Sequence, residues 1–234
     1  GLAVAGRYIR SALKIPDVMS DASAANTFAV DLAGYYQSEV TAYGDFDGRW
    51  RAGFNIQNLG PKISYDDDEF SSNFLPTDLR LGAGFDFIMD EYSTIGITLE
   101  TTKLMVPTPQ NREGMTAEER AQAYDDYQRT NWFSGAFESF TDAPDGFKEE
   151  LKEFTLGGGV EYTYQDSFAL RLGYFSEHET KGARKYFTLG AGFKYNIMKI
   201  DVSYLMSTSK VQNPLENTLR FSLTFNFGDK YDEY

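Results

Sequence analysis

Long stretches in which apolar and polar residues strictly alternate constrain this chain most. The alternation runs through 46–57 and recurs in 79–89 and in 219–227. Successive side chains of a strand point to opposite faces, so each stretch predicts a strand with one apolar and one polar face. The pattern indicates an all-β protein.

The whole chain, read in this way, predicts ten strands, and most of them are ten residues or longer. Strands of soluble proteins typically have about 5–6 residues, whereas a tilted strand that crosses a bilayer needs about 9–11. Short turns alternate with longer loops, which is typical of outer-membrane barrels. We therefore expect a transmembrane antiparallel β-barrel in a bacterial outer membrane, with its long loops extracellular. The expected strands are 2–14, 26–40, 45–57, 77–89, 93–104, 152–165, 167–178, 184–197, 199–208 and 217–227.

Composition excludes several classes of function. The formal net charge of -13 argues against nucleic-acid binding, which needs clustered Lys and Arg. The chain has no Cys and one His, at position 178, so it lacks the residues for thiolate sites and multi-His metal sites, and no arrangement of a nucleophile, this His and a carboxylate can be placed in the sequence. We expect no enzyme activity, no cofactor and no metal; a weak divalent-ion site at His178 and its neighbouring carboxylates is the less favoured alternative.

A soluble β-sandwich or lipocalin-like barrel would also alternate apolar and polar residues. Several glycines lie on the polar face of the expected strands, where they would only weaken a solvent-facing strand but would suit a crowded lumen. This favours the membrane barrel. These glycines are Gly82, Gly84, Gly157, Gly159, Gly190 and Gly192.

Charged residues on the same polar face should line the lumen. They form either a neutralising ladder that holds the barrel rigid or a polar conduit, and the sequence leaves both open. The basic residues are Arg49, Arg51, Arg80, Arg171, Lys194 and Arg220, and the acidic ones are Asp31, Asp86, Glu100, Glu161 and Asp201.

Residues 105–151 form an insertion too long for a simple loop. Thr116 and Glu119 match a capping box, and good helix formers continue to Arg129, which predicts a short helix. The aromatic-rich stretch 132–140 follows; it either folds into the barrel mouth or meets a partner.

Several segments resemble the PorV family, the FadL-like outer-membrane components of the type IX secretion system. They include FLPTDLRLGAG at 74–84 and FTDAPDGFKEELKE at 140–153, together with 63–65, 103–109, 182–193 and 213–221. The resemblance implies a fourteen-stranded barrel with an N-terminal plug, of which this chain carries the last ten strands. On that basis 1–234 is a single barrel domain that lacks its plug and first strands, with 105–151 as an extracellular insertion.

The resemblance also implies a function. PorV-like proteins are non-enzymatic carriers that bind secreted cargo by its C-terminal signal domain and pass it from the translocon to a surface sortase complex, which attaches it to lipopolysaccharide. The alternative is a FadL-like transporter of hydrophobic small molecules. Because aromatic side chains dominate interface energetics, the expected partner-binding residues in the extracellular loops are Phe70, Phe74, Leu75, Trp132, Phe133 and Phe140.

Overall fold

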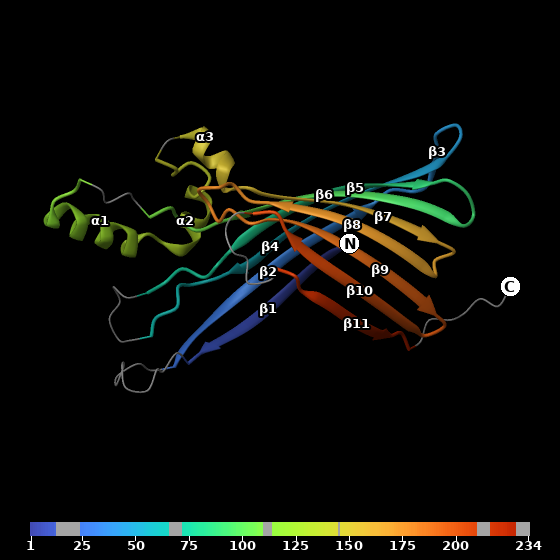
Figure 1. Ribbon diagram of the computed structural model, residues 1–234. Coiled ribbons are helices and arrows are strands. Elements are labelled where there is room, and N and C mark those ends of the chain that lie inside the picture. The colour runs from blue at the N-terminus through green and yellow to red at the C-terminus, as the bar shows by residue number, and fades with distance from the viewer. Residues whose placement is uncertain (13–23, 66–71, 110–113, 145, 210–215, 228–234) are drawn as a thin grey trace. The chain divides into compact units, whose positions relative to one another are not determined.

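The computed structural model describes residues 1–12, 24–65, 72–109, 114–144, 146–209 and 216–227. It confirms the all-β class, because its strands form one sheet with the order β1-β2-β4-β5-β6-β7-β8-β9-β10-β11, with β3 paired to β4 (Figure 1). The ten expected strands are present, and β3 is an additional strand of two residues. Their bounds are β1 Leu2–Ser11, β2 Ala25–Gln37, β3 Thr41–Ala42, β4 Asp47–Leu59, β5 Asp78–Ile88, β6 Ser93–Leu104, β7 Thr155–Tyr164, β8 Phe168–Ser176, β9 Lys185–Tyr195, β10 Met198–Ser207 and β11 Leu219–Phe225.

Helices occur in the long insertion between β6 and β7. The predicted helix is α1, Ala117–Arg129, and the capping box at Thr116 and Glu119 is formed. Two helices were not expected: α2, Trp132–Glu138, and α3, Phe147–Glu150, which continues as a 3-10 turn to Glu153. Because of that turn, β7 starts at Thr155 rather than at 152. Among the described residues, no helix is long and apolar enough to cross a membrane.

The contacts divide the chain into two compact units. Unit 1 comprises Gly1–Tyr35, Phe54–Leu81 and Thr102–Phe154, and unit 2 comprises Tyr36–Gly53, Gly82–Thr101 and Thr155–Tyr234. Strands β2, β4, β5 and β6 contribute residues to both units.

Unit 1 shows the alternation most clearly in β2. Thr27, Ala29 and Asp31 are buried, whereas Phe28 and Val30 between them are exposed. Ala25 and Ala29 pack with two loop residues, Ile63 and Leu75, in the apolar core of this unit. The face of β2 that carries small and polar side chains is therefore buried, and the bulky apolar side chains lie on the opposite, exposed face.

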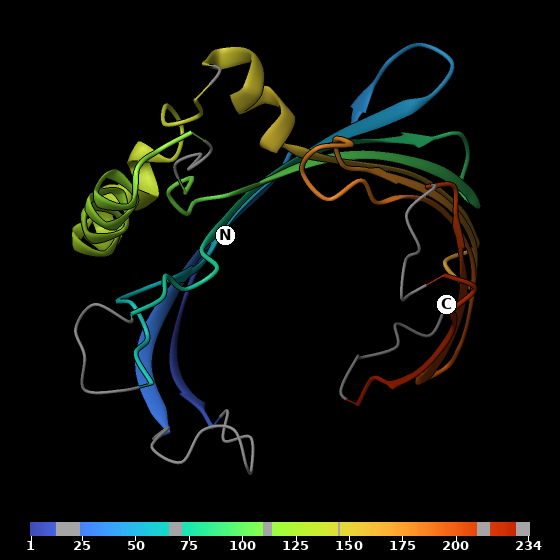
Figure 2. The same ribbon diagram turned by 60° about the vertical axis from the view of Figure 1, so that its left-hand side comes forward.

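Unit 2 contains β7 to β11, which lie side by side in a curved sheet (orange to red in Figure 2). The hairpin between β7 and β8 has Gln165 and Asp166 at φ of 50°, the left-handed conformation that matches the twist of a tight hairpin. The pairing is antiparallel and sets Glu161 of β7 opposite Arg171 of β8. The register therefore places charged residues of neighbouring strands on one face.

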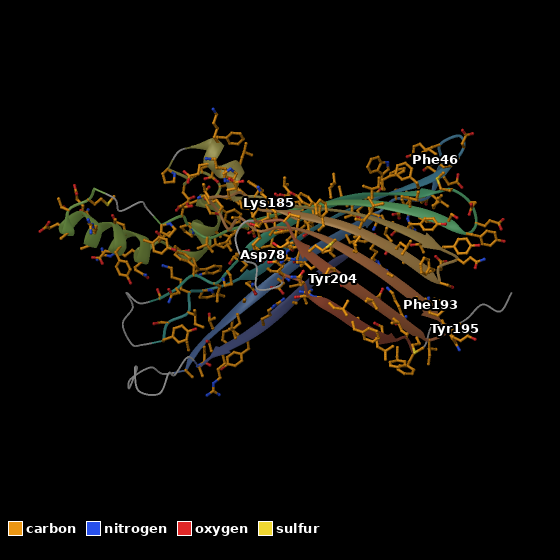
Figure 3. All side chains as sticks on the ribbon, viewed as in Figure 1. Phe46, Asp78, Lys185, Phe193, Tyr195 and Tyr204 are labelled. Atoms are coloured by element: carbon orange, nitrogen blue, oxygen red, sulfur yellow. The ribbon has the colours of Figure 1, made fainter. Side chains whose placement is uncertain are left out.

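The opposite face of β7 to β11 exposes large apolar side chains. Phe193 and Tyr195 lie towards the short-turn end of β9, and Lys185 lies at its other end (Figure 3). So many exposed apolar side chains on one face of a sheet are unusual for a soluble protein and are expected for strands that face lipid. They include Leu156, Val160, Leu170, Leu172, Leu189, Phe193, Leu219, Phe221 and Leu223.

Candidate functional site

A buried lysine joins the insertion to the end of β6. Lys103 is 1% exposed, and its Nζ lies 3.0 Å from Glu150 Oε2 and 2.6 Å from Glu153 Oε2. The ammonium also lies 5.4 Å from the ring centre of Phe140 and 5.5 Å from that of Phe154. A buried cation needs such partners because its transfer from water costs several kcal/mol. The Lys103 cluster thus fixes α3 and the following 3-10 turn to the sheet.

Hydrogen bonds extend this cluster along the insertion. Glu150 Oε1 accepts a hydrogen bond from the Ala143 amide at 2.8 Å. Asp142 accepts from the amide of Thr108 at 2.7 Å and from its hydroxyl at 3.1 Å. The two ends of the insertion, near Thr108 and near Asp142, are therefore held together by a charged network.

Helix α1 is fixed to the loop between β4 and β5 by a second set of contacts. The rings of Phe74 and Tyr127 meet edge to face at 5.3 Å between centres. Lys62 lies 4.1 Å above the Phe74 ring and donates a hydrogen bond to the Gln128 carbonyl at 2.8 Å. Burial lowers the pKa of Lys62; burial, with the nearby charge of Asp142, raises the pKa of Tyr127. Both side chains are thus partly buried where α1 meets this loop.

Helix α2 presents aromatic rings to solvent. Asn131 caps its first turn by accepting a hydrogen bond from the Phe133 amide at 2.8 Å. Phe133 and Phe137 are one helical turn apart, 51% and 53% exposed, with their ring centres 5.2 Å apart. Trp132 contacts Phe133 at 5.6 Å. We call Trp132, Phe133 and Phe137 the aromatic ridge.

The structure separates the expected partner-binding residues by environment. Leu75 is buried in the core of unit 1, Phe74 lies against Lys62 of the loop after β4, and Phe140 lies near Lys103 of β6. Trp132 and Phe133 belong to the aromatic ridge. Phe70 lies outside the described residues.

Sequence reasoning missed some exposed apolar residues beside these candidates in the insertion. Among them are Phe137, Phe147 and Leu151, with exposed fractions of 53%, 75% and 55%. The spacing of four between Phe133 and Phe137 was the available signal for the first of them. It was inconspicuous because the helix is short and contains Gly135.

Charged residues of unit 2 pair across the polar face. Arg49 and Arg51 of β4 both contact the Asp86 carboxylate at 2.8 Å, and that side chain is only 8% exposed. Arg171 of β8 contacts Glu161 of β7, and its Nη1 lies 2.7 Å from Asp201 Oδ1 on β10. These contacts form two clusters of ion pairs, one on β4 and β5 and the other on β7, β8 and β10.

The remaining lumen candidates have different surroundings. Arg80 pairs with Asp78 at 3.0 Å. Lys194 lines a cavity of about 400 Å³ that also includes Glu161, Arg171 and Lys199. Arg220 is an exposed residue of β11.

Glycines give the arginine of β8 its reach. Arg171 faces Gly190 on β9, and Asp201 of β10 faces Gly192 on the same strand. A Cβ at Gly192 would lie 2.6 Å from Asp201 Oδ1 and 2.9 Å from Arg171 Nη1. The absence of a side chain on β9 therefore lets an ion pair pass over this strand.

His178 and the neighbouring Glu177 form hydrogen bonds with other residues of the same loop. Glu177 receives a hydrogen bond from Arg184 Nε at 2.8 Å, and His178 Nδ1 lies 2.9 Å from the Thr180 hydroxyl. Across the part of the chain that the structure describes, no group of three or more His, Asp or Glu residues is arranged to hold a metal ion.

Comparison with known proteins decides the family. Residues 1–111 match the family described as "Type IX secretion system protein PorV". This chain belongs to the PorV family. It is thus a component of the type IX secretion system, from a family of outer-membrane proteins. A search of curated proteins finds no match.

The PorV match covers the N-terminal part of the chain, whereas the resemblance was expected to extend to its C-terminal part. Three of the motifs quoted for it, at 140–153, 182–193 and 213–221, lie outside the matched range. The motifs at 63–65, 74–84 and 103–109 lie inside it. The PorV assignment therefore rests on β1 to β6 and the loops that join them.

Proposed function

We propose that this PorV-family protein is a non-enzymatic carrier. It binds the C-terminal signal domain of secreted cargo and passes the cargo from the translocon to the surface sortase complex. The observation that carries this proposal is the aromatic ridge on α2, in which Phe133 and Phe137 are exposed and Trp132 is half-buried, on a loop region that is anchored to strand ends. Exposed, preorganised aromatic side chains are the usual centres of protein interfaces.

Anchoring is what makes this loop region suitable for docking. The Lys103 cluster fixes α3, and the contacts between Phe74 and Tyr127 fix α1. A fixed loop loses less conformational entropy on binding than a free one. The cargo would therefore meet a surface that is already in its binding arrangement.

Loop lengths support an extracellular position for this surface. Connections between strands alternate along the chain: the short ones follow β3, β5, β7 and β9, and the longer ones follow β1, β4, β6, β8 and β10. In outer-membrane barrels the short turns are periplasmic and the long loops are outside. Helices α1 to α3 belong to the long connection after β6.

The alternative, transport of hydrophobic small molecules, has weaker support. The cavity on the polar face is lined by charged residues such as Glu161, Arg171 and Lys194. A site for a hydrophobic ligand would instead be mostly apolar.

Cargo capture by detergent-purified protein tests the carrier proposal. The variant Phe133→Ala with Phe137→Ala removes two rings of the ridge. It keeps Asp142 and Ala143, whose hydrogen bonds hold the insertion together. We expect a loss of affinity for the C-terminal signal domain of at least about tenfold, since a centrally placed ring contributes more than about 1 kcal/mol. The control is Tyr92→Ala with Tyr195→Ala, two exposed tyrosines at the short-turn ends of strands. Equal affinity of the ridge variant and the control would refute the assignment of the ridge.

A further inference from the structure

A hollow lies on the apolar face of unit 2, beside the turns that follow β3 and β5. It has a volume of about 410 Å³, within the range of small-molecule sites, and is lined by Tyr43, Phe46, Trp50, Phe85 and Leu99 among others. We call it the aromatic groove. Its lining is almost entirely apolar, so a polar ligand would lose its hydration there without compensation.

The rings of the groove support one another. Phe85 contacts Trp50 edge to face at 4.7 Å between centres and contacts Tyr43 in the same way at 5.6 Å. Gly48 lies beneath them, and a Cβ at that position would clash with the rings of Phe85 and Tyr43. The hollow is therefore a packed arrangement of aromatic side chains and not a gap between flexible ones.

The groove is continuous with the surface expected to face lipid. Trp50 is 54% exposed and Leu99 is 66% exposed, and both lie on the face opposite Arg49, Arg51 and Asp86. In a membrane the molecules that reach such a face are lipids, whose hydrocarbon chains match its apolar lining. An acyl chain is thus the part of a ligand that this groove suits.

The turns beside the groove indicate the charge of the head group. The turns carry Asp45, Asp90 and Glu91, and neither 43–46 nor 89–92 contains Lys or Arg. Carboxylates attract an ammonium group and repel a head group with net negative charge. The groove therefore favours a zwitterionic phospholipid that carries an ammonium group.

We propose that the aromatic groove is a lipid-binding site that holds one acyl chain of a phosphatidylethanolamine, with the ammonium group of this lipid beside Asp45. The proposal rests on the outer-membrane placement of the family and is independent of cargo capture by the aromatic ridge.

Fluorescence quenching tests this site directly, because the chain has only two tryptophans. In a Trp132→Phe background Trp50 is the sole reporter. The protein is placed in nanodiscs of phosphatidylcholine that contain a small fraction of phosphatidylethanolamine or phosphatidylglycerol with brominated acyl chains, which quench on contact. We expect half-maximal quenching at a mole fraction of phosphatidylethanolamine several-fold lower than that of phosphatidylglycerol.

Two variants and a control complete the test. Ala83→Leu fills the groove, and Asp45→Asn neutralises the carboxylate of the turn after β3; each should abolish the preference between the two lipids. Ala191→Leu adds the same side chain to the apolar face of β9, outside the groove, and should retain the preference. Equal quenching by both lipids in the unmodified groove, or a preference that survives both variants, would overturn the proposal.

Discussion

The Nζ of Lys103 lies 2.6 Å from Oε2 of Glu153, although 50 residues separate them along the chain. The lysine is the penultimate residue of β6, and the glutamate is the last residue of the 3-10 turn before β7. This pair closes the base of the insertion that carries the aromatic ridge. The position of the ridge therefore depends on the charge of Lys103, a residue outside the ridge.

Replacing Lys103 by Ala should loosen the insertion. Glu150 and Glu153 would remain beside each other without their cation, and breaking one partner of a buried ion pair costs about 3–5 kcal/mol. Hydrogen exchange of amides 139–153 in detergent should accelerate by about 100-fold or more, since about 1.4 kcal/mol corresponds to a factor of ten. Lys148→Ala, which removes an exposed lysine of α3, should leave exchange unchanged.

A rescue variant separates charge from packing in this cluster. Lys103→Met combined with Glu150→Gln and Glu153→Gln removes all three charges and keeps similar volumes. It should recover much of the protection lost in Lys103→Ala, because an uncharged, well-packed replacement avoids the cost of unpaired buried charge. No recovery would mean that specific geometry, and not charge balance, holds the insertion.

Enlarging Gly135 should separate α2 from the rest of the insertion. A Cβ at this position would lie 2.7 Å from Pro107 Cγ and 3.1 Å from Thr130 Cγ2. Gly135→Val should therefore cost about 1–3 kcal/mol by overpacking and increase protease cleavage in 130–140. Ser134→Val introduces the same side chain at the exposed neighbouring position of the same helix and should be cleaved like the parent protein. Similar cleavage of both variants would contradict the close packing of Gly135.

Acid should weaken the first turn of α1. Hydrogen bonds from the backbone and side chain of Thr116 lower the pKa of Glu119 below its usual 4.5. A carboxyl whose pKa is lower in the folded state stabilises that state above pH 4.5, and the contribution is lost as pH falls through the lowered value. Hydrogen exchange at 117–121, corrected for the intrinsic rate at each pH, should accelerate below pH 4.5. Glu119→Gln keeps an acceptor without titrating and should remove this pH dependence.

Adding a methyl group at Gly192 should break the ion pair that passes over β9. The new Cβ would lie 2.6 Å from Asp201 Oδ1 and 2.9 Å from Arg171 Nη1, so both side-chain ends must move away from their present positions. Gly192→Ala should lower the temperature at which the protein loses its folded mobility on unheated gels. Gly157→Ala is the matched control, because its nearest neighbour is a carbonyl oxygen at 4.0 Å. Equal unfolding temperatures would show that the Arg171 and Asp201 pair contributes little.

The alternation of residue types by itself determined the ten strands and their two faces. It did so because the side chains of a strand alternate with a period of two whatever the strand pairs with. The start of α1 was equally readable, since the capping box at Thr116 and Glu119 needs only residues three apart. The PorV resemblance added the family, which the match over 1–111 supports.

Only the tertiary structure decided which aromatic residues remain available to a partner. Phe74 and Phe133 look alike in the sequence, yet one packs against Tyr127 and the other is half exposed on α2. The environment of Lys103 and the reach of Arg171 over Gly192 were likewise unpredictable. Each of these environments is formed by residues from separate elements, which come into contact only when strand register and loop packing are fixed. No local sequence pattern predicts such contacts.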